Sequence, residues 1–442
     1  MLSESIVSSR DAISSNARHF TLAQSIGHEG NSKMKLALQR LSLIANSYVL
    51  MQGHLNWAIP LVTRDHGTSC RVSQVESFHP VLAQSGRAIL ASPDAIGILG
   101  EQVLVATSMI YVGGVLVPDA AIIRIDRRGV GAVVTADSTV GSLVYPRIVS
   151  GKTGAVVLYP EASSGDEFIS KFRLGVLRLG VASLSPLSAG PRFTDAGWLS
   201  SGASSYSLQS GEFSMSSRDS DADRIVRAAF DDKSATVKFD TISIKGLRLT
   251  QHPRLSGISP NRLLVVSALF SELRSRKPAL FALPVRGSIA DSSRAVELSR
   301  FSGLLPRFVG SASSLRNHLV VWRNESGSPA SGYALFSIEG ELLARGDFDQ
   351  GVSELTDPVA VSPSEFVVAV RDEQQDALRL LMISKTGARE LLRMPSQGVR
   401  TRLVQHGTNR LRVLEIQTIN DGGQRITALT SAAFSIHCVP KP

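Results

Sequence analysis

A short phrase returns along this chain at a nearly constant interval, and this repeat constrains the fold more than any other feature. The phrase is a proline, a variable residue, apolar residues, a polar gap and a long apolar run. It begins at Pro93 (SPDAIGILGEQVLVATSM), Pro146 (YPRIVSGKTGAVVLYPEA), Pro253 (HPRLSGISPNRLLVVSAL), Pro306 (LPRFVGSASSLRNHLVVWRN) and Pro358 (DPVAVSPSEFVVAVRD). Consecutive copies lie 53, 53 and 52 residues apart, and a fixed period of this kind indicates a repeat architecture.

Two further units complete the series. Because the interval from Pro146 to Pro253 spans two periods, we expect a degenerate copy near residue 199, where Trp198–Gly211 lacks the proline. A last, shorter unit (TRLVQHGTNRLRVLEIQ) starts near Arg402. The repeat therefore predicts seven units.

Each unit has the pattern of four β-strands. In the fifth unit we expect strands at residues 304–309, 318–323, 332–338 and 341–345, separated by polar turns. Proline lacks an amide donor and is tolerated at the first residue of a strand, so we expect it to head each unit. Helical periodicity is scarce after residue 55, with Asp221–Phe230 as a short candidate.

A four-stranded unit at this period predicts an all-β fold, a seven-bladed β-propeller with four antiparallel strands per blade. A single β-sandwich has too few strands, and tandem sandwiches would not give a regular spacing. Strand-like pieces at residues 57–90 either pair with the last blade or form a small eighth blade. We therefore expect a leader or short helical segment at 1–55 and a propeller at 56–442.

The two ends of a propeller must meet, because the fold removes its exposed sheet edges by closing. The only two cysteines, Cys70 and Cys438, lie in the two terminal strand regions. We expect them to face each other across the closure and to form a possible disulfide, which Cα atoms more than about 7 Å apart would exclude.

Composition excludes some classes of partner. The formal charge is +9, but the basic residues are scattered and the aromatic residues, at 6%, are not interleaved with them. Nucleic-acid binders show a basic stripe and aromatic platforms, so we expect no nucleic-acid partner. No apolar run is long enough for a membrane-spanning helix.

The N-terminal region leaves the localisation open. Lys35 and Arg40 precede the moderately apolar run Leu41–Met51, which resembles a secretory signal if Met34 is the true start, and would make the protein secreted or periplasmic. A short amphipathic helix or a frayed leader is the alternative.

One phrase carries a family resemblance. The run LPRFVG…HLVVWRNESGSPASGYALFSIEGELL, around Pro306–Gly346, resembles repeats of bacterial propellers in the sialidase-like group and of related surface proteins. The phrase YPRIV…VVLYPEAS is also similar to glycosidase-type five-bladed propellers. The resemblance implies a propeller fold. The sialidase aspartate box and Trp-Asp repeats are missing from the sequence, so the resemblance leaves the activity open.

Three arginines occupy one repeat position. Arg147, Arg254 and Arg307 each follow the proline of their unit, so we expect them around one axis, where guanidinium groups bind a carboxylate through charge-assisted bonds. The alternative is that this residue faces a loop or a carbonyl of the neighbouring blade.

Acidic residues lie near the prolines that begin the repeat units. They are Asp94, Glu161, Asp195 and Asp357, with Tyr145 beside Pro146 as a further candidate. Glycoside hydrolysis needs two such carboxyl groups about 5–10 Å apart. Solvated loop residues are the alternative.

Metal and cofactor signatures are incomplete. Asp219–Asp223 has the alternating carboxylates of a calcium loop without its glycine or distal glutamate, and the histidines show no ligand pair. We therefore expect no metal and no cofactor.

The sequence favours a monomeric, non-catalytic propeller that binds a protein or glycan through its loop face or central channel. The alternative is a glycan-active enzyme of the sialidase or glycoside hydrolase type.

Overall fold

The computed structural model describes residues 68–440 apart from internal stretches at 113–114, 136–146, 151–153, 163–171, 181–183, 194–201, 208–209, 217–223, 232–235, 245–246, 259–260, 271–278, 301–307, 325–330, 349–350, 373–374, 408 and 422. The chain divides into one unit at Met1–His66, which is not described, and another at Gly67–Pro442. The expected domain boundary at residues 55–56 and the candidate secretory signal lie outside the described residues.

The first two groups of strands follow one plan, in which successive strands pair side by side. The first sheet is five-stranded, in the order β2-β6-β5-β4-β3. Its strands are β2 (Leu82–Ala83), β3 (Ala95–Leu99), β4 (Gln102–Val112), β5 (Val115–Ile125) and β6 (Val130–Thr135). The next sheet is four-stranded and contains β7 (Arg147–Ser150), β8 (Ala155–Ala162), β9 (Phe172–Leu179) and β10 (Leu184–Phe193).

The middle of the chain forms one nine-stranded sheet. One group within it contains β11 (Gly202–Ser207), β12 (Ser210–Ser216), β13 (Arg224–Asp231) and β14 (Thr236–Ile244). The other contains β15 (Leu247–Ile258), β16 (Asn261–Phe270), β17 (Ala279–Arg286), β18 (Ile289–Ala290) and β19 (Val296–Arg300), with the 3-10 turn η1 at Ser292–Arg294. The short strand β18 joins the groups by pairing in parallel with β14 and antiparallel with β17. Because of this join, the count of seven blades stays a prediction.

Two regular sheets follow. One is four-stranded, with β20 (Phe308–Ser313), β21 (Asn317–Arg323), β22 (Gly332–Ser337) and β23 (Leu342–Asp347). The other is five-stranded, with β24 (Val352–Leu355), β25 (Val359–Ala360), β26 (Phe366–Asp372), β27 (Ala377–Ser384) and β28 (Gly387–Pro395). The second strands, β21 and β26, are buried along almost their whole length, as expected for strands covered on both faces.

The last sheet is built from both ends of the described chain. Its order is β1-β31-β30-β29, with β1 (Thr68–Pro80), β29 (Val399–Gln405), β30 (Arg410–Asp421) and β31 (Gln424–Pro440). β1 pairs antiparallel with β31. It is therefore the fourth strand of the C-terminal sheet, which is the closure by the last blade that the sequence left as one of two alternatives.

A main-chain bridge reinforces this closure. Just after β1, Val81 donates its amide to the carbonyl of Leu429 in β31, and Leu429 donates to the carbonyl of Ile89, both at 2.9 Å. The chain then enters the first sheet through β2, which pairs in parallel with β6. The first and last sheets are thus held together by backbone hydrogen bonds as well as by side chains.

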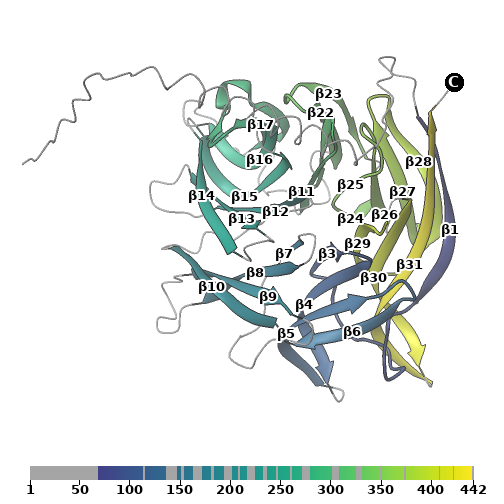
Figure 1. Ribbon diagram of the computed structural model, residues 1–442. Coiled ribbons are helices and arrows are strands. Elements are labelled where there is room, and N and C mark those ends of the chain that lie inside the picture. The colour runs from purple at the N-terminus through teal and green to yellow at the C-terminus, as the bar shows by residue number, and fades with distance from the viewer. Residues whose placement is uncertain are drawn as a thin grey trace, which may run out of the picture. The chain divides into compact units, whose positions relative to one another are not determined.

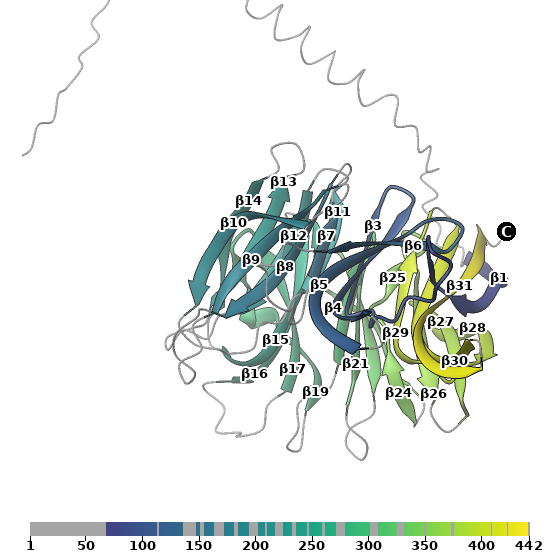
Figure 2. The same cartoon turned by 90° about the horizontal axis from the view of Figure 1, so that it is seen from below.

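The apolar core is divided among the spaces between neighbouring sheets. Leu104 and Ile122 of the first sheet pack with Val157 of the next. Equivalent clusters lie between the β20–β23 and β24–β28 sheets, around Leu335 and Val368. Figure 1 shows the sheets of the described unit around a common centre, with β3, β7, β11, β24 and β29 nearer the middle, and Figure 2 shows the strands from below. Sheets that surround one centre and pack face to face form a propeller.

One local prediction is wrong. Residues 224–230 of the candidate helix Asp221–Phe230 lie in strand β13, in register with β12 and β14. Of the first strand expected in the fifth unit, at residues 304–309, residues 308–309 lie in β20, which continues to Ser313, and residues 304–307 lie outside the described residues.

Candidate functional site

In the units headed by Pro253 and Pro358, the repeat proline lies at an irregularity of the inner strand and not at its first residue. In β15 the register with β16 shifts between Gln251 and Arg254, and Pro253 lies in that shift. Pro358 lies in the gap between β24 and β25, which both pair with β26. A proline cannot donate to the ladder, so it is accommodated at a bulge of an edge strand. The expectation that the proline begins the first strand is wrong in these two units.

A further arginine occupies the repeat position that follows this irregularity. Arg147, Arg254 and Arg402 lie opposite Leu158, Val265 and Leu414 of their second strands, respectively. Arg402 is not among the arginines predicted from the repeat because Thr401 stands where other units have proline. The signal was present, since TRLV matches PRIV and PRFV at the arginine and the two apolar positions that follow it.

Arg400, just before this position, meets Asp94 across the junction between the last and first sheets. Its Nη1 donates to Asp94 Oδ1 at 2.9 Å and to Ser92 Oγ at 2.8 Å. Ser92 Oγ also donates to Asp94 Oδ1 at 2.8 Å. The Asp94 side chain is 14% exposed and that of Arg400 is 58% exposed, so the carboxylate is sheltered while much of the cation faces solvent.

The backbone at Arg400 has an unusual conformation. Its φ is 54°, in the left-handed region that non-glycine residues adopt rarely. The register of β29 with β30 shifts between Val399 and Arg402, so Arg400 lies in the irregular segment. This conformation costs about 1–3 kcal/mol and persists where the surroundings fix it.

Arg402 reaches the neighbouring blade through a main-chain oxygen. Its Nη1 donates to the carbonyl of Thr401 at 3.0 Å, and its Nη2 approaches the carbonyl of Asp94 at 3.4 Å. For this repeat position the described arginine thus contacts an inter-blade carbonyl, the alternative that the sequence left open. Arg402 and Arg400 therefore hold the head of β3 from two sides.

A buried carboxylate lies behind this pair. Glu415 of β30 is fully buried and accepts hydrogen bonds from Ser396 Oγ at 2.6 Å and Thr401 Oγ1 at 3.0 Å. Gln417 Nε2 donates to it at 2.9 Å. Since buried polar groups must be hydrogen-bonded to be tolerated, this network fixes the segment that carries Arg400 and Arg402.

For most of the other predicted site residues, the side chains lie outside the described residues. The backbones of Arg147, Arg254 and Glu161 lie in β7, β15 and β8, while their side chains, and all of Tyr145 and Arg307, lie outside the described residues. The convergence of the three predicted arginines stays a prediction. Of the predicted site residues, the structure describes the side chains of Asp94, which lies with Arg400 and Arg402, and of Asp357, which is exposed. Asp195 lies outside the described residues.

Two other titratable groups are buried. His318 is fully buried, contacts Ser313 Oγ through Nδ1 at 2.5 Å, and has its pKa lowered to about 4 by desolvation. Substrate cannot reach a serine and histidine that are both buried, so this pair is structural. Arg412 has its pKa lowered by desolvation, opposed by the nearby carboxylate of Glu76, whose Oε2 lies 3.6 Å from Nη2.

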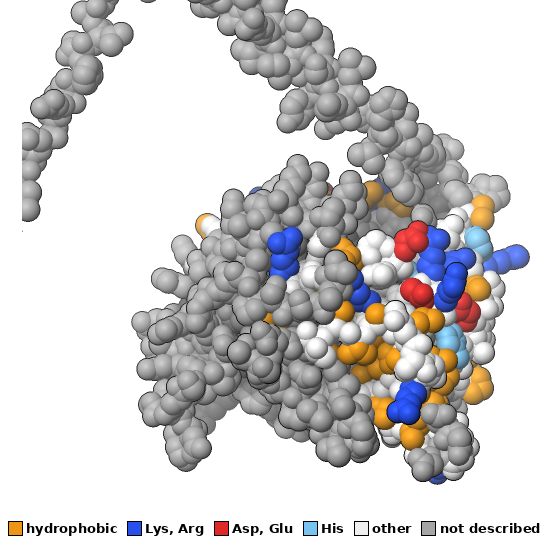
Figure 3. Space-filling view, turned by 60° about the horizontal axis from the view of Figure 1, so that its bottom comes forward, with side chains coloured by type: hydrophobic (Ala, Val, Ile, Leu, Met, Phe, Trp, Pro, Cys, Tyr) orange, Lys and Arg blue, Asp and Glu red, His pale blue; other side chains and the backbone are white. Residues whose placement is uncertain are grey.

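The surface of the described residues mixes both signs of charge. Figure 3 shows basic and acidic side chains beside one another on the coloured part of one face, with apolar side chains between them. Among the described residues no helix has the length and apolar character needed to cross a membrane.

Comparisons with known proteins agree with this fold. No protein-family model and no curated protein matches the sequence. The solved structure of polysaccharide lyase Uly1 is similar, with 10% identity, a TM-score of 0.51 and coverage of 83% of this chain and 98% of that one. The WD40 domain of Toxoplasma gondii coronin has 10% identity, a TM-score of 0.46 and coverage of 83% and 86%. The β-propeller domain of the Trilobed protease from Pyrococcus furiosus has 11% identity, a TM-score of 0.44 and coverage of 77% and 95%.

These observations define the class of protein. Sheets around one centre, cores between neighbouring sheets and a closing sheet shared by both chain ends make the chain an all-β propeller. The similarity to Uly1 concerns the fold alone, since propellers serve many unrelated functions.

Proposed function

We propose that the protein is a non-catalytic binding propeller that recognises a carboxylate-bearing protein or glycan at the face where its inner strands begin. The observation that carries this proposal is Arg400, an exposed guanidinium held in a strained backbone conformation at the junction of β3 and β29. Strained residues that the surroundings hold in place concentrate at binding sites.

The hydrogen bonds of Arg400 leave it able to bind a ligand. Its Nη1 is used by Asp94 and Ser92, and no described residue accepts from its Nε or Nη2. A guanidinium presents five donors in a planar fork that matches a carboxylate bidentately. Asp94 therefore orients the cation while one edge stays available to an anionic group.

The positions of other charged residues within the repeat also point to this face as the binding face. Asp94 precedes β3, Arg147 begins β7 and Arg402 follows the bulge near the start of β29, so charged residues lie near the start of these three inner strands. Because the units share one strand order, these starts belong to one face of the ring. The net charge of +9 favours encounter with acidic partners.

Glycan arrays and calorimetry test the proposal. The wild-type protein is applied to matched sialylated, uronic-acid and neutral glycans and to acidic and neutral peptides. We expect binding to the acidic members alone, and loss of this binding in Arg400→Gly. Glycine adopts a positive φ without strain, and this gain offsets the loss of the ion pair with Asp94, so the variant should stay folded with a stability close to that of the wild type.

Matched controls separate binding from folding. Asp376→Gly relieves a positive φ of 46° at the β26–β27 turn and should leave binding unchanged. Arg316→Ala removes an exposed arginine from the β20–β21 turn and should also leave it unchanged. Equal binding of neutral ligands, unaltered binding by Arg400→Gly, or turnover of fluorogenic glycosides would each overturn the proposal.

A further inference from the structure

The two cysteines lie directly opposite each other where the chain ends meet. Cys70 of β1 pairs in register with Cys438 of β31, and their Cα atoms are 4.0 Å apart. The structure has a disulfide between them. Cys70 is 2% exposed, whereas Cys438 is partly exposed, so the two cysteines differ in burial.

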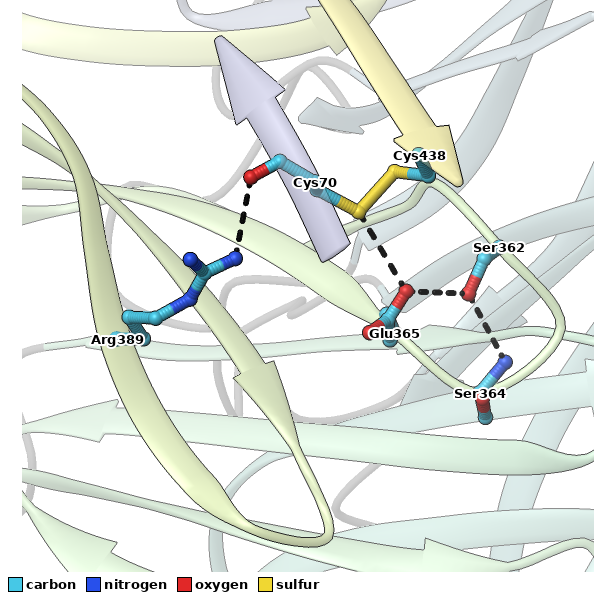
Figure 4. The surroundings of a disulfide bond; sticks show 6 residues. All are labelled: Cys70, Ser362, Ser364, Glu365, Arg389 and Cys438. Atoms are coloured by element: carbon cyan, nitrogen blue, oxygen red, sulfur yellow. Dashed lines mark hydrogen bonds between the residues drawn. A yellow bond between two sulfur atoms is a disulfide. The ribbon is translucent and has the colours of Figure 1, made fainter. Parts of the chain in front are cut away.

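A buried carboxylate from a different sheet points at this pair. Glu365, just before β26, is 3% exposed, and its Oε2 lies 3.6 Å from Cys70 Sγ (Figure 4). Ser362 Oγ donates to the same oxygen at 3.0 Å. A disulfide sulfur carries no hydrogen and therefore cannot donate a hydrogen bond to this carboxylate. A thiol at the same place could donate one, and a metal ion there could bind the carboxylate.

The three side chains form a ligand set of the right type and size. Their ligand atoms all lie within 4.8 Å of one another, a cluster found by searching the described residues. Zinc bound tetrahedrally by sulfur at 2.3 Å and oxygen at about 2.1 Å places these two ligand atoms about 3.6 Å apart. The observed separation of Cys70 Sγ and Glu365 Oε2 is also 3.6 Å.

We propose that the reduced protein binds a zinc ion through Cys70, Cys438 and Glu365. A dithiol reductant supplies two electrons and two protons, the sulfur–sulfur bond breaks to give two thiols, and the reductant becomes a disulfide. Zinc then binds the two thiolates and the carboxylate, and the two thiol protons pass to solvent. Water takes the fourth position, which the exposed side of Cys438 leaves open.

Charge around the site is compatible with this ligand set. Two thiolates and one carboxylate exceed the charge of Zn²⁺ by one negative charge. Arg389 of β28 lies beside the site and donates through Nη2 to the carbonyl of Cys70 at 3.1 Å. Because Glu365 belongs to the neighbouring sheet, the metal joins β1, β31 and the β24–β28 sheet, and closes the ring when the disulfide is absent.

Cobalt and zinc titrations test the inference. The full chain is reduced under anaerobic conditions, freed of reductant and metal, and titrated with Co²⁺ alone. We expect one Co²⁺ per chain, with thiolate-to-metal charge-transfer absorption and the visible bands of tetrahedral cobalt, displaced by Zn²⁺. Zinc should also raise the thermal midpoint of the reduced protein, because a ligand that binds only the folded state stabilises it.

Two variants and the oxidised protein complete the test. Glu365→Gln should weaken Co²⁺ binding about tenfold or more and change the visible bands, since loss of even outer-shell partners costs this much. Glu341→Gln, at an exposed glutamate away from the site, should bind as the wild type does, and the oxidised wild type should bind no metal. Absence of charge-transfer absorption in the reduced wild type, or wild-type binding by Glu365→Gln, would overturn the inference.

Discussion

The disulfide at the closure should make a large contribution to stability. Cys70 and Cys438 are separated by 368 residues, so their bond closes nearly the whole described chain into one loop. The chain-entropy relation gives about 6 kcal/mol for a loop of this length at 25 °C. The net stability of a folded protein is about 5–15 kcal/mol, so the cross-link represents a large share of it.

Cys438→Ala is the appropriate perturbation. Cys438 is partly exposed, so alanine at this position opens no large cavity, whereas Cys70 lies in the core cluster between the last two sheets. The pair also lies near the ends of both strands, since Thr68 pairs with Pro440 two residues away. Loss of the bond therefore leaves the ends of β1 and β31 held by hydrogen bonds and by apolar packing without a covalent link.

Equilibrium unfolding in urea measures the effect. With EDTA present throughout to exclude metal, we expect the free energy of unfolding of Cys438→Ala to fall by about 2–6 kcal/mol, where the upper end is the chain-entropy value for this loop. The reduced wild type should unfold at the same urea concentration as the variant. Coincidence of the oxidised wild type and Cys438→Ala would refute the reasoning, because the bond would then not constrain the unfolded chain.

Three further predictions concern buried groups. The pKa of His318 is lowered from 6.5 to about 4, so between these pH values the unfolded chain protonates this histidine and the folded chain does not. The free energy of unfolding should therefore fall by about 3 kcal/mol as the pH drops from 6.5 to 4. Urea titrations should show this slope in the wild type and not in His318→Gln. A Cβ at Gly398 would overlap the carboxylate of Glu415, so Gly398→Ala should lose about 1–3 kcal/mol in the same assay. Trp322 is fully buried, and Trp322→Ala should lower the free energy of unfolding by about 3–5 kcal/mol, measured as a shift of the urea midpoint at constant slope.

The middle strands of the blades could be predicted from sequence. The expected strands at residues 318–323 and 332–338 correspond to β21 at Asn317–Arg323 and β22 at Gly332–Ser337. These strands are buried on both faces, so selection for apolar residues leaves a continuous run between polar turns. The same apolar run between polar turns recurs in successive units of the repeat.

The inner and bridging strands could not be predicted as well. β20 continues to Ser313, beyond the expected end at residue 309, through small and polar residues that give no apolar signal in the sequence. β18 has two residues, and its parallel pairing with β14 depends on where two neighbouring groups meet in space. No local pattern in the sequence specifies such a pairing.

The candidate sites show why a repeat predicts a fold better than a function. Arg400 and Asp94 are 306 residues apart, and Glu365 and Cys70 are 295 apart, yet each pair meets where two sheets face each other. A repeat reports what every unit shares, which is the strand plan and the apolar core. A site arises where one unit departs from the others and meets a neighbour, as Arg400 does through its positive φ. Arg402 could have been predicted from the repeat because it occupies the position that the units share. The contacts of Arg400 and Glu365, in contrast, become visible only where the ring closes in the structure.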